Sequence, residues 1–501
     1  MAEPNRKKGI LDPIIDLIRW AWDRLERTIL LGIKFVFPSR FISPLGFLGM
    51  LTTVVFIILG ITGALLLFNY VPTYGDCTTP TSATCNVAYN SVSAINNQVG
   101  WGSIMRNIHY HASNAMVLLA VMHMFYQYFA GRYKLRYEML WVTGIIIGVV
   151  TIIEAYSGYD LIVNIRGQLA INIGRTLTLN TPVIGADLAG IVFGFSSNDL
   201  VLRFYSLHVF IIPIIMLAIM AVHLPRNLVL DIPVSSAITG IIFLLGGLFP
   251  VELGIKFIAG QETQITFPEW YFTSLYAFLR VYGVSAIIGG IIIPTVFVLI
   301  FLIIPFFDRG KKIAMVDRPF WVALGVAALG QMAIVTVWGF RGGNPFEPLT
   351  GVGQLVIDPA LFFGSLLIAS ALAYGFVYAF VKWRRARLEQ LRAQRKPVPF
   401  RRLPPYLLTK GETYSLFGGL LLLQAFLDMS IFRAVLAGLQ NFALIEIGMV
   451  LIAFARSFCP VRTTTLVSGA SAWISSSSRS PSVGSSGLGG RPRSMVTTAG
   501  S

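Results

Sequence analysis

Charged residues are scarce in this chain. Of its 501 residues, 12% are Asp, Glu, Lys or Arg and 55% are hydrophobic, whereas a soluble domain normally carries about 25% charged residues. The deficit excludes a water-soluble multidomain enzyme of this length, and it excludes a disordered or collagen-like chain. It is explained if most of the chain lies in lipid, where a spanning helix needs roughly 20 apolar residues.

Acidic residues are scarcer than basic ones, and the formal net charge is +16. In a membrane protein this surplus indicates cytoplasmic loops, where Lys and Arg accumulate, and we expect no nucleic-acid partner. The segment 71–100 contains one acid, Asp76, and neither Lys nor Arg. An outward loop of that composition is compatible with an acidic exterior, in which carboxylates lose their charge.

Cysteine is also rare, with three in the chain. Cys77 and Cys85 share the segment 71–100, and Cys459 lies near the end. Two cysteines on an outward face have one pairing available, but the spacing leaves open whether the disulfide forms.

Long apolar runs make up most of what is present. Eight of them have about the length of a membrane-spanning helix, at about 45–70, 104–130, 139–158, 203–224, 236–258, 284–307, 319–340 and 360–382. Before them, residues 10–37 mix apolar with charged side chains, which predicts an amphipathic helix on the cytoplasmic surface. After them, the apolar stretch 415–455 predicts one broken helix or a short hairpin.

The basic residues orient these spans. Between positions 382 and 402 nine Lys or Arg residues stand against one acid, Glu389. Placing this segment inside puts both ends of an eight-span chain in the cytoplasm. The loops outside are then 71–100, 159–202, 259–283 and 341–359. From 457 onward the chain is rich in Ser, Gly, Thr and Arg and lacks acids, which predicts a disordered tail.

Histidine is the most informative scarce residue. The chain has five, all within two predicted spans: His109, His111, His123, His208 and His223. His109 and His123 are nearly four helical turns apart and project from one face, whereas His111 does not. Pro213, between His208 and His223, permits a kink or local unwinding that brings those two rings into line. The spacing predicts two stacked pairs, His109 with His208 near the outside and His123 with His223 near the inside.

Two neutral imidazoles on opposite sides of a flat group suit the axial positions of haem iron, whereas zinc requires four ligands. The simpler alternative is a helix–helix hydrogen bond for each His, but packing gives no reason for a repeat at four-turn spacing.

Four glycines on neighbouring spans also repeat every fourteen residues: Gly49 with Gly63, and Gly144 with Gly158. They leave room for a haem edge, or serve ordinary small-residue packing. Arg106 and Arg203 precede the outer histidines and are candidates for the anionic propionates, or interfacial anchors.

Five segments carry these motifs in a fixed order. They are RNIHYHASNAMVLLAVMHMF at 106–125, WVTGIIIGVVTIIEAYSGY at 141–159, TPVIGADLAGIVFG at 181–194, RFYSLHVFIIPIIMLAIMAVHL at 203–224 and FPEWYF at 267–272. Together they resemble the cytochrome b subunit of quinol-oxidising cytochrome bc complexes, over roughly residues 40–340. The fifteen-residue step on the second histidine helix resembles the chloroplast and cyanobacterial branch, whereas the single fused chain resembles the mitochondrial branch.

The resemblance implies two haems, b-type or an a-type variant. His109 and His208 would bind the low-potential haem near the outside, and His123 and His223 the high-potential haem near the inside. It also implies an outer quinol site lined by Pro268, Glu269, Trp270 and Tyr271, where the glutamate accepts a quinol proton. For this glutamate alone, an acid stabilised by the dipole at a helix start is an equal alternative.

The chain departs from the family at several positions. Glu154, inside the third span, replaces a usually neutral residue, and we expect it near the outer quinol site as a second proton-accepting carboxylate. Asp160 follows Tyr159 where the family usually continues with Leu-Pro-Trp. The inner quinone site is poorly marked, with Arg226, Asn227 and Asp231 as candidates.

The predicted fold is an all-α polytopic membrane protein with about eight to ten transmembrane helices. Its parts are a cytoplasmic amphipathic helix (1–40), a four-helix dihaem bundle (41–230), a C-terminal quinol-site helical domain (231–382), a basic cytoplasmic linker (383–412), an additional membrane helix or hairpin (413–456) and the disordered tail (457–501).

The predicted function is electron transfer in a respiratory complex of a prokaryotic plasma membrane, in an archaeon or an acidophile. Quinol gives one electron to a Rieske-type iron–sulfur protein, and the other crosses the bilayer through the two haems. Further partners are complex subunits such as a cytochrome or terminal oxidase, and a homodimer stays open. The alternatives are a dihaem membrane anchor of a dehydrogenase or hydrogenase, and a proton-coupled transporter, which predicts internal repeats.

Overall fold

The computed structural model describes residues 12–25, 32–36, 44–77, 84–224, 227–259, 266–341, 355–394, 445 and 447–452. Its helices are α1 (Asp12–Leu25), α2 (Leu48–Leu67), α3 (Val87–Asn97), α4 (Gly102–Phe129), α5 (Glu138–Asp160), α6 (Ile165–Leu179), α7 (Gly185–Phe193), α8 (Ser197–Ser206), α9 (Ile212–His223), α10 (Ile232–Leu248), α11 (Thr273–Arg280), α12 (Ile293–Phe307), α13 (Pro319–Phe340) and α14 (Pro359–Ala393). Short helical turns are η1 (Pro44–Phe47), η2 (Leu207–Ile211), η3 (Ile288–Ile292) and η4 (Met315–Asp317). One parallel strand pair, β1 (Gly32–Val36) with β2 (Asn227–Asp231), completes the described part.

Each of the eight predicted spans overlaps a helix, although 236–258 is helical only to Leu248, and the helical membrane fold is confirmed. Six helical segments of the described chain are long and apolar enough to cross a bilayer: Leu48–Leu67, Glu138–Asp160, Ser197–His223, Ile288–Phe307, Pro319–Phe340 and Pro359–Ala393. The other two predicted spans are α4, whose sequence includes three histidines and an arginine, and α10, which is apolar but only 17 residues long.

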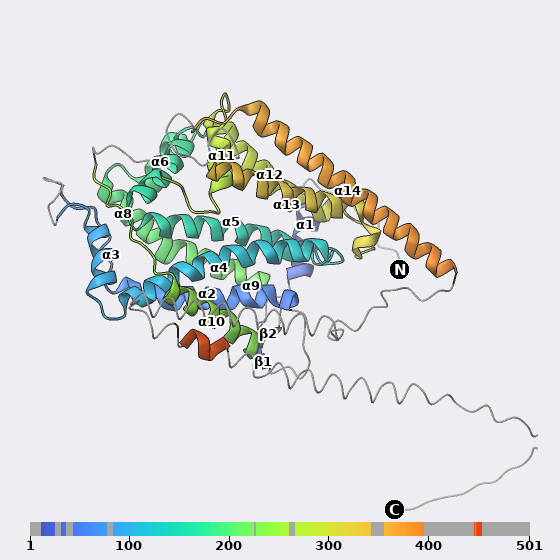
Figure 1. Cartoon of the computed structure of the whole chain (residues 1–501), viewed down its shortest axis with the longest axis horizontal. Coiled ribbons are helices and arrows are strands. Elements are labelled where there is room, and N and C mark those ends of the chain that lie inside the picture. Colours follow the sequence, from blue (N-terminus) through green and yellow to red (C-terminus); the bar gives the residue numbers. More distant parts are fainter. Residues whose placement is uncertain are drawn as a thin grey trace, which may run out of the picture.

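Four helices form a bundle around the histidines. α2 packs along α4, α5 packs along α9, and α4 contacts α5, as Figure 1 shows. The bundle core includes Val55, Ala112, Met216 and, from α10, Ile242. Because this core comes from helices far apart in the sequence, it fixes their mutual heights as well as their spacing.

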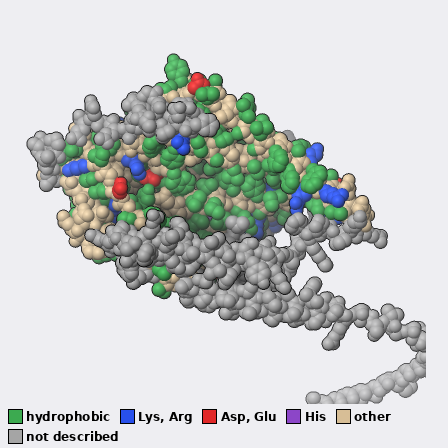
Figure 2. All heavy atoms as spheres, in the orientation of Figure 1, with side chains coloured by type: hydrophobic (Ala, Val, Ile, Leu, Met, Phe, Trp, Pro, Cys, Tyr) green, Lys and Arg blue, Asp and Glu red, His purple; other side chains and the backbone are tan. Residues whose placement is uncertain are grey.

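A second helical group lies beside the bundle. In it α13 packs against both α11 and α14 around Ala277, Trp338 and Phe362. α12 joins this group to the bundle through Phe301, which packs with Phe125 and accepts a hydrogen bond from the Trp141 indole at 2.6 Å. In the orientation of Figure 1, Figure 2 shows a broad hydrophobic surface on the face of the molecule that is turned to the viewer. Lys and Arg side chains lie at the end of this surface where α14 finishes.

Two spanning helices contain a π-helical turn, and each turn ends two residues before a proline. η2 precedes Pro213 and η3 precedes Pro294. Proline has no N–H, so the carbonyl one turn earlier loses its usual donor. Closing the turn with i→i+5 bonds is one way in which the helix continues past such a point.

Some predicted boundaries are wrong. The amphipathic helix predicted over 10–37 covers only α1, and the chain then forms β1. α14 does not end at 382 but continues to Ala393, so the first part of the predicted linker is helical. Of the predicted segment 413–456, residues 445 and 447–452 are described and are helical, with Ile445 packed on Leu244 of α10. The predicted tail lies outside the described residues.

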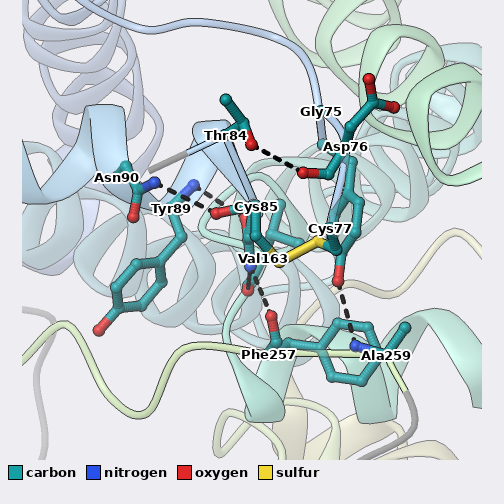
Figure 3. The surroundings of a disulfide bond; sticks show 12 residues. Gly75, Asp76, Cys77, Thr84, Cys85, Tyr89, Asn90, Val163, Phe257 and Ala259 are labelled. Carbon is teal, nitrogen blue, oxygen red and sulfur yellow. Dashed lines mark hydrogen bonds between the residues drawn. A yellow bond between two sulfur atoms is a disulfide. The ribbon is translucent and has the colours of Figure 1, made fainter. Parts of the chain in front are cut away.

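The segment 71–100 contains the disulfide that the spacing left open. Cys77 and Cys85 are joined at 1.98 Å, as Figure 3 shows. The Thr84 hydroxyl donates to the Asp76 carbonyl at 2.9 Å, and the Asn90 amide donates to the Cys85 carbonyl at 3.2 Å. These bonds fix the short loop beside the start of α3.

The opposite end of the bundle is held by buried charges. Asp308, after α12, lies 2.5 Å from Lys134 Nζ and 3.4 Å from Arg318 Nη1, with all three side chains at most 7% exposed. The Tyr133 hydroxyl donates to the same carboxylate at 2.6 Å. One acid thus connects the loop after α4 to the loop between α12 and α13.

Candidate functional site: two stacked histidine pairs

The structure brings four histidines together in two pairs. The ring centres of His109 and His208 are 6.3 Å apart, and those of His123 and His223 are 6.4 Å apart. A metal–imidazole bond is about 2 Å long and a ring nitrogen lies about 1 Å from its ring centre, so two imidazoles on opposite sides of one ion have centres about 6 Å apart. Both pairs therefore have the separation that two imidazoles bound to one metal ion would have.

The π-helical turn η2 explains how two different residue spacings, fourteen on one helix and fifteen on the other, place the two histidines of each pair side by side. His208 lies within η2, whose i→i+5 bonds take up one more residue than an α-helical turn. Fifteen residues from His208 to His223 consequently cover nearly the same rotation as the fourteen from His109 to His123 on α4. The alignment that Pro213 was expected to permit is achieved by this turn.

Three of the four rings are held by a hydroxyl that directly precedes one of the four glycines. Nδ1 of His109 lies 2.9 Å from Thr62 Oγ1, that of His223 3.2 Å from Thr143 Oγ1, and that of His208 3.2 Å from Ser157 Oγ.

Each of these hydroxyls donates its own hydrogen to a backbone carbonyl one turn earlier, at 2.7, 2.9 and 2.9 Å for Thr62, Thr143 and Ser157. The hydroxyl oxygen is then an acceptor, so Nδ1 carries the imidazole hydrogen and Nε2 keeps its lone pair. A free Nε2 lone pair is what a metal ligand requires.

The glycines lie against the imidazoles. A Cβ at Gly49 would stand 2.9 Å from His123, at Gly63 3.2 Å from His109, and at Gly144 2.8 Å from His223, and at Gly158 it would meet His208 more closely still. The space that was expected for a haem edge is thus space for the imidazole ring in this structure. Free Nε2 atoms, axial spacing and these glycine gaps fit a haem at each level.

Glu269 lies in a small polar cluster. Its side chain is 8% exposed, its Oε1 is 3.1 Å from Arg166 Nη1, and the Tyr110 hydroxyl donates to Oε2 at 3.2 Å. Next to it, the Trp270 indole donates to Asn114 Oδ1 at 2.7 Å. The Pro268–Tyr271 motif is thereby attached to α4, the helix of His109.

Other predicted residues have different neighbours. Arg106 donates to the carbonyls of Val251 and Glu252 at 2.7 and 3.1 Å. Arg203 donates to the carbonyls of Gly190 and Ile191. Arg106 therefore ties the loop after α10 to α4, and Arg203 ties α7 to α8.

His111 and Glu154 also find partners. Nε2 of His111, which had no predicted role, lies 2.8 Å from the Phe249 carbonyl after α10. Oε1 of Glu154 lies 3.2 Å from Nδ1 of His208. Glu154 therefore contacts a member of the outer histidine pair.

Of the inner quinone candidates, Arg226 and the Asn227 side chain lie outside the described part. Asp231 is fully buried and accepts from the Val234 N–H as the N-cap of α10. It thus stabilises a helix start.

Sequence reasoning missed the three hydroxyls, and it missed Tyr110 and Arg166. The available signal was a Ser or Thr immediately before three of the four glycines. It also gave no role to Asp160, which is 2% exposed.

Two family models match the chain. One, described as "Cytochrome b(N-terminal)/b6/petB", matches residues 114–228, and the other, described as "Cytochrome b(C-terminal)/b6/petD", matches residues 262–357. The first contains His123, His208 and His223, and the second contains Pro268–Tyr271. Three of the four paired histidines and the Pro268–Tyr271 motif thus lie within the matched residues, whereas His109 lies before them.

The chain is also similar to curated proteins and to a solved structure. Cytochrome b6 of Synechococcus elongatus is 31% identical over 207 residues, covering 41% of this chain and 91% of that protein. Cytochrome b of Sulfolobus acidocaldarius is 25% identical over 427 residues, covering 73% of this chain and 72% of that protein. A chain of "Hyperthermophilic respiratory Complex III" has the same fold, with a TM-score of 0.52 at 20% identity, covering 75% of this chain and 99% of that chain.

Proposed function

The chain belongs to the cytochrome b family, and on that premise we propose that it oxidises quinol at an outer site and carries electrons inward across a prokaryotic plasma membrane. The family is one of haem-binding membrane proteins of electron transport. The observation that carries the proposal is the presence of two imidazole pairs at separate levels of one bundle, with ring centres 6.3 and 6.4 Å apart.

In this proposal His109 and His208 hold the outer haem, and His123 and His223 hold the inner one. When bound, the haem irons supply one-electron transfer between the two levels. In His109, His208 and His223 a hydroxyl at Nδ1 leaves the Nε2 lone pair free, and a glycine gap lies behind each of the four rings. Arg106 and Arg203 remain candidates for the propionates, since each guanidinium has five N–H donors.

Glu269 is the proposed proton acceptor at the outer site. Oxidation of one quinol to quinone releases two protons and two electrons. Glu269 takes one of the protons, and water at the outer face takes the other. Arg166 and Tyr110 hold its carboxylate in place, while a carboxylate has about four lone-pair sites, so acceptor capacity remains. Because Arg166 is 47% exposed, its guanidinium has room to move as the proton arrives.

The reaction needs a partner for the other electron. We propose a Rieske-type iron–sulfur protein, reduced by one electron at the outer face, together with further subunits of a respiratory complex. The Cys77–Cys85 disulfide supports placing the segment 71–100 outside, where thiols are oxidised. That orientation leaves the N-terminus in the cytoplasm.

Haem content tests the ligand assignment. We expect the purified complex to contain two haems per chain by absorption of the reduced minus oxidised protein, which also separates b-type from a-type. His208→Leu and His223→Leu should each halve that ratio. His111→Gln is the matched control on the same bundle and should keep both haems. A native chain without haem would overturn the proposal.

Quinol turnover tests the outer site separately. Glu269→Gln removes the proton acceptor and should slow quinol oxidation by about 10²–10⁴-fold, the usual contribution of a general base, with both haems retained. Glu252→Gln changes an exposed acid of the neighbouring loop and should leave turnover unchanged. Equal turnover in the two variants would remove Glu269 from the mechanism.

A further inference from the structure

The main difference between the two histidine pairs is a carboxylate, that of Glu154, which contacts the outer pair. Glu154 Oε1 lies 3.2 Å from His208 Nδ1, and each side chain is 20% exposed. The other oxygen, Oε2, is buried and accepts no hydrogen bond from a described residue. The histidine is therefore the polar partner that the described structure offers to this acid.

The local sequence directs three groups of α5 at the same ring. Glu154, Ser157 and Gly158 stand at i, i+3 and i+4, which is one helix face. His208 Nδ1–H meets the Glu154 backbone carbonyl at 3.1 Å and the Ser157 hydroxyl at 3.2 Å, in addition to the carboxylate. An acid on a spanning helix is costly, so its place against this ring indicates a role there.

The inner pair has no such group among the described residues. His223 has the Thr143 hydroxyl at 3.2 Å as its side-chain partner. Nδ1 of His123 is buried and has no hydrogen-bond partner in the described chain. Three of the four glycines directly follow a Ser or Thr, whereas Gly49 directly follows Leu48.

The physical consequence concerns the ligand's electron donation. A carboxylate behind a metal-ligating histidine fixes its tautomer and makes it a more basic ligand. Hydrogen bonding to axial ligands is one of the protein's means of setting a haem potential. A nearby negative charge also favours the oxidised state, which carries one more positive charge. Both effects lower the reduction potential.

We propose that Glu154 is a positioning residue that lowers the reduction potential of the outer haem relative to the inner one. Electron transfer from the outer to the inner level is then favourable. This inference rests on the proposed function, because it requires His208 to be an axial ligand. It assigns to Glu154 a role different from accepting a quinol proton.

Potentiometric titration of the purified complex, followed by haem absorption, tests it. Glu154→Gln keeps the size of the side chain and removes its charge. We expect the outer midpoint to rise by about 59 mV, which is a tenfold change in the ferrous-to-ferric ratio for one electron. Ser157→Ala, which removes a neutral partner of the same ring, should raise it less. The inner midpoint should stay unchanged in both variants.

Thr143→Val is the matched control at the inner level. It removes the hydroxyl partner of His223 and should change the inner midpoint only. An outer midpoint that is unchanged in Glu154→Gln, with two haems retained, would overturn the inference and leave the proposed function intact. A native complex lacking two haems would overturn both.

A second variant tests the inference in the case that Glu154→Gln loses the outer haem. If Glu154→Gln does not retain the outer haem, Glu154→Asp decides, because it keeps the charge and withdraws it from the ring by one methylene. A raised outer midpoint in Glu154→Asp supports the inference, and a native midpoint contradicts it.

Discussion

The outer and inner halves of the bundle use the same repeat but differ in what surrounds it. At the outer level His208 meets a carboxylate, a carbonyl and a hydroxyl, and the nearby loop is closed by a disulfide. At the inner level His123 Nδ1 has no described partner, and the adjoining loops are held by buried charges around Asp308. The helical period thus accounts for the likeness, and neighbouring helices account for the difference.

The largest stability effect should come from the inner half. Asp308→Asn leaves Lys134 and Arg318 buried without their acid, and removing one partner of a buried ion pair costs about 3–5 kcal/mol. We expect a clear fall in the thermal unfolding midpoint of the complex in detergent. Asp187→Asn, at an exposed position of α7, should change it little. Equal midpoints for the two variants would show that the buried charges do not hold this end.

The outer half should lose less when its disulfide is removed. Cys77→Ser removes a cross-link that closes a short loop, which is worth about 2–3 kcal/mol in the chain-entropy account. Limited proteolysis should then cut within 71–100 while the inner haem spectrum stays native. Cys459→Ser is the control. Unchanged protease resistance in Cys77→Ser would contradict the prediction.

Glycine substitutions compare the fit around each ring. Gly158→Ala places a Cβ against His208 in the tightest of the four gaps, and overpacking costs about 1–3 kcal/mol. It should reduce outer haem occupancy, measured by absorption per chain. At Gly63 the Cβ contact would be 3.2 Å, so Gly63→Ala should be tolerated better. The reverse order would mean that the glycine gaps do not set the fit.

The smallest effect should come from adding a hydroxyl beside His123, whose Nδ1 has no hydrogen-bond partner in the described chain. Leu48→Thr places a hydroxyl before Gly49, as in the other three positions, where it can accept from His123 Nδ1. Lost apolar burial and the gained hydrogen bond each amount to about 1–3 kcal/mol and largely cancel. The inner midpoint should fall in a potentiometric titration, while the outer midpoint stays fixed. A rise of the inner midpoint would contradict this.

Local sequence was enough to predict the elements but not all their ends. Hydropathy located the eight spans because each needs lipid-length apolar surface. It misjudged 10–37, where an amphipathic pattern continues past Leu25 but the backbone pairs β1 with β2. It also ended α14 at 382, since a hydropathy argument stops at the membrane edge while a helix continues into water.

The candidate site was predictable in the pairing of its histidines but not in the groups that surround each ring. The fourteen-residue step places His109 and His123 on one face by helix geometry alone. The role of Arg106 was inferred from closeness in sequence and that of Glu154 from its place in the third span, where the family is usually neutral. The structure joins Arg106 to carbonyls after α10 and Glu154 to His208. Such contacts lie between helices, where no short-range pattern reports them.

The sequence by itself determined that this is a helical membrane protein with histidines and glycines in register, because periodicity and hydropathy are properties of single helices. The tertiary structure decided how the fifteen-residue step between His208 and His223 is brought into line with the fourteen-residue step on α4, through the π turn at His208. It also decided which Nδ1 atoms are held by a hydroxyl or an acid. The physical reason is that hydrogen bonds to a buried ring come from a different helix, whose height and rotation are fixed only when the cores pack.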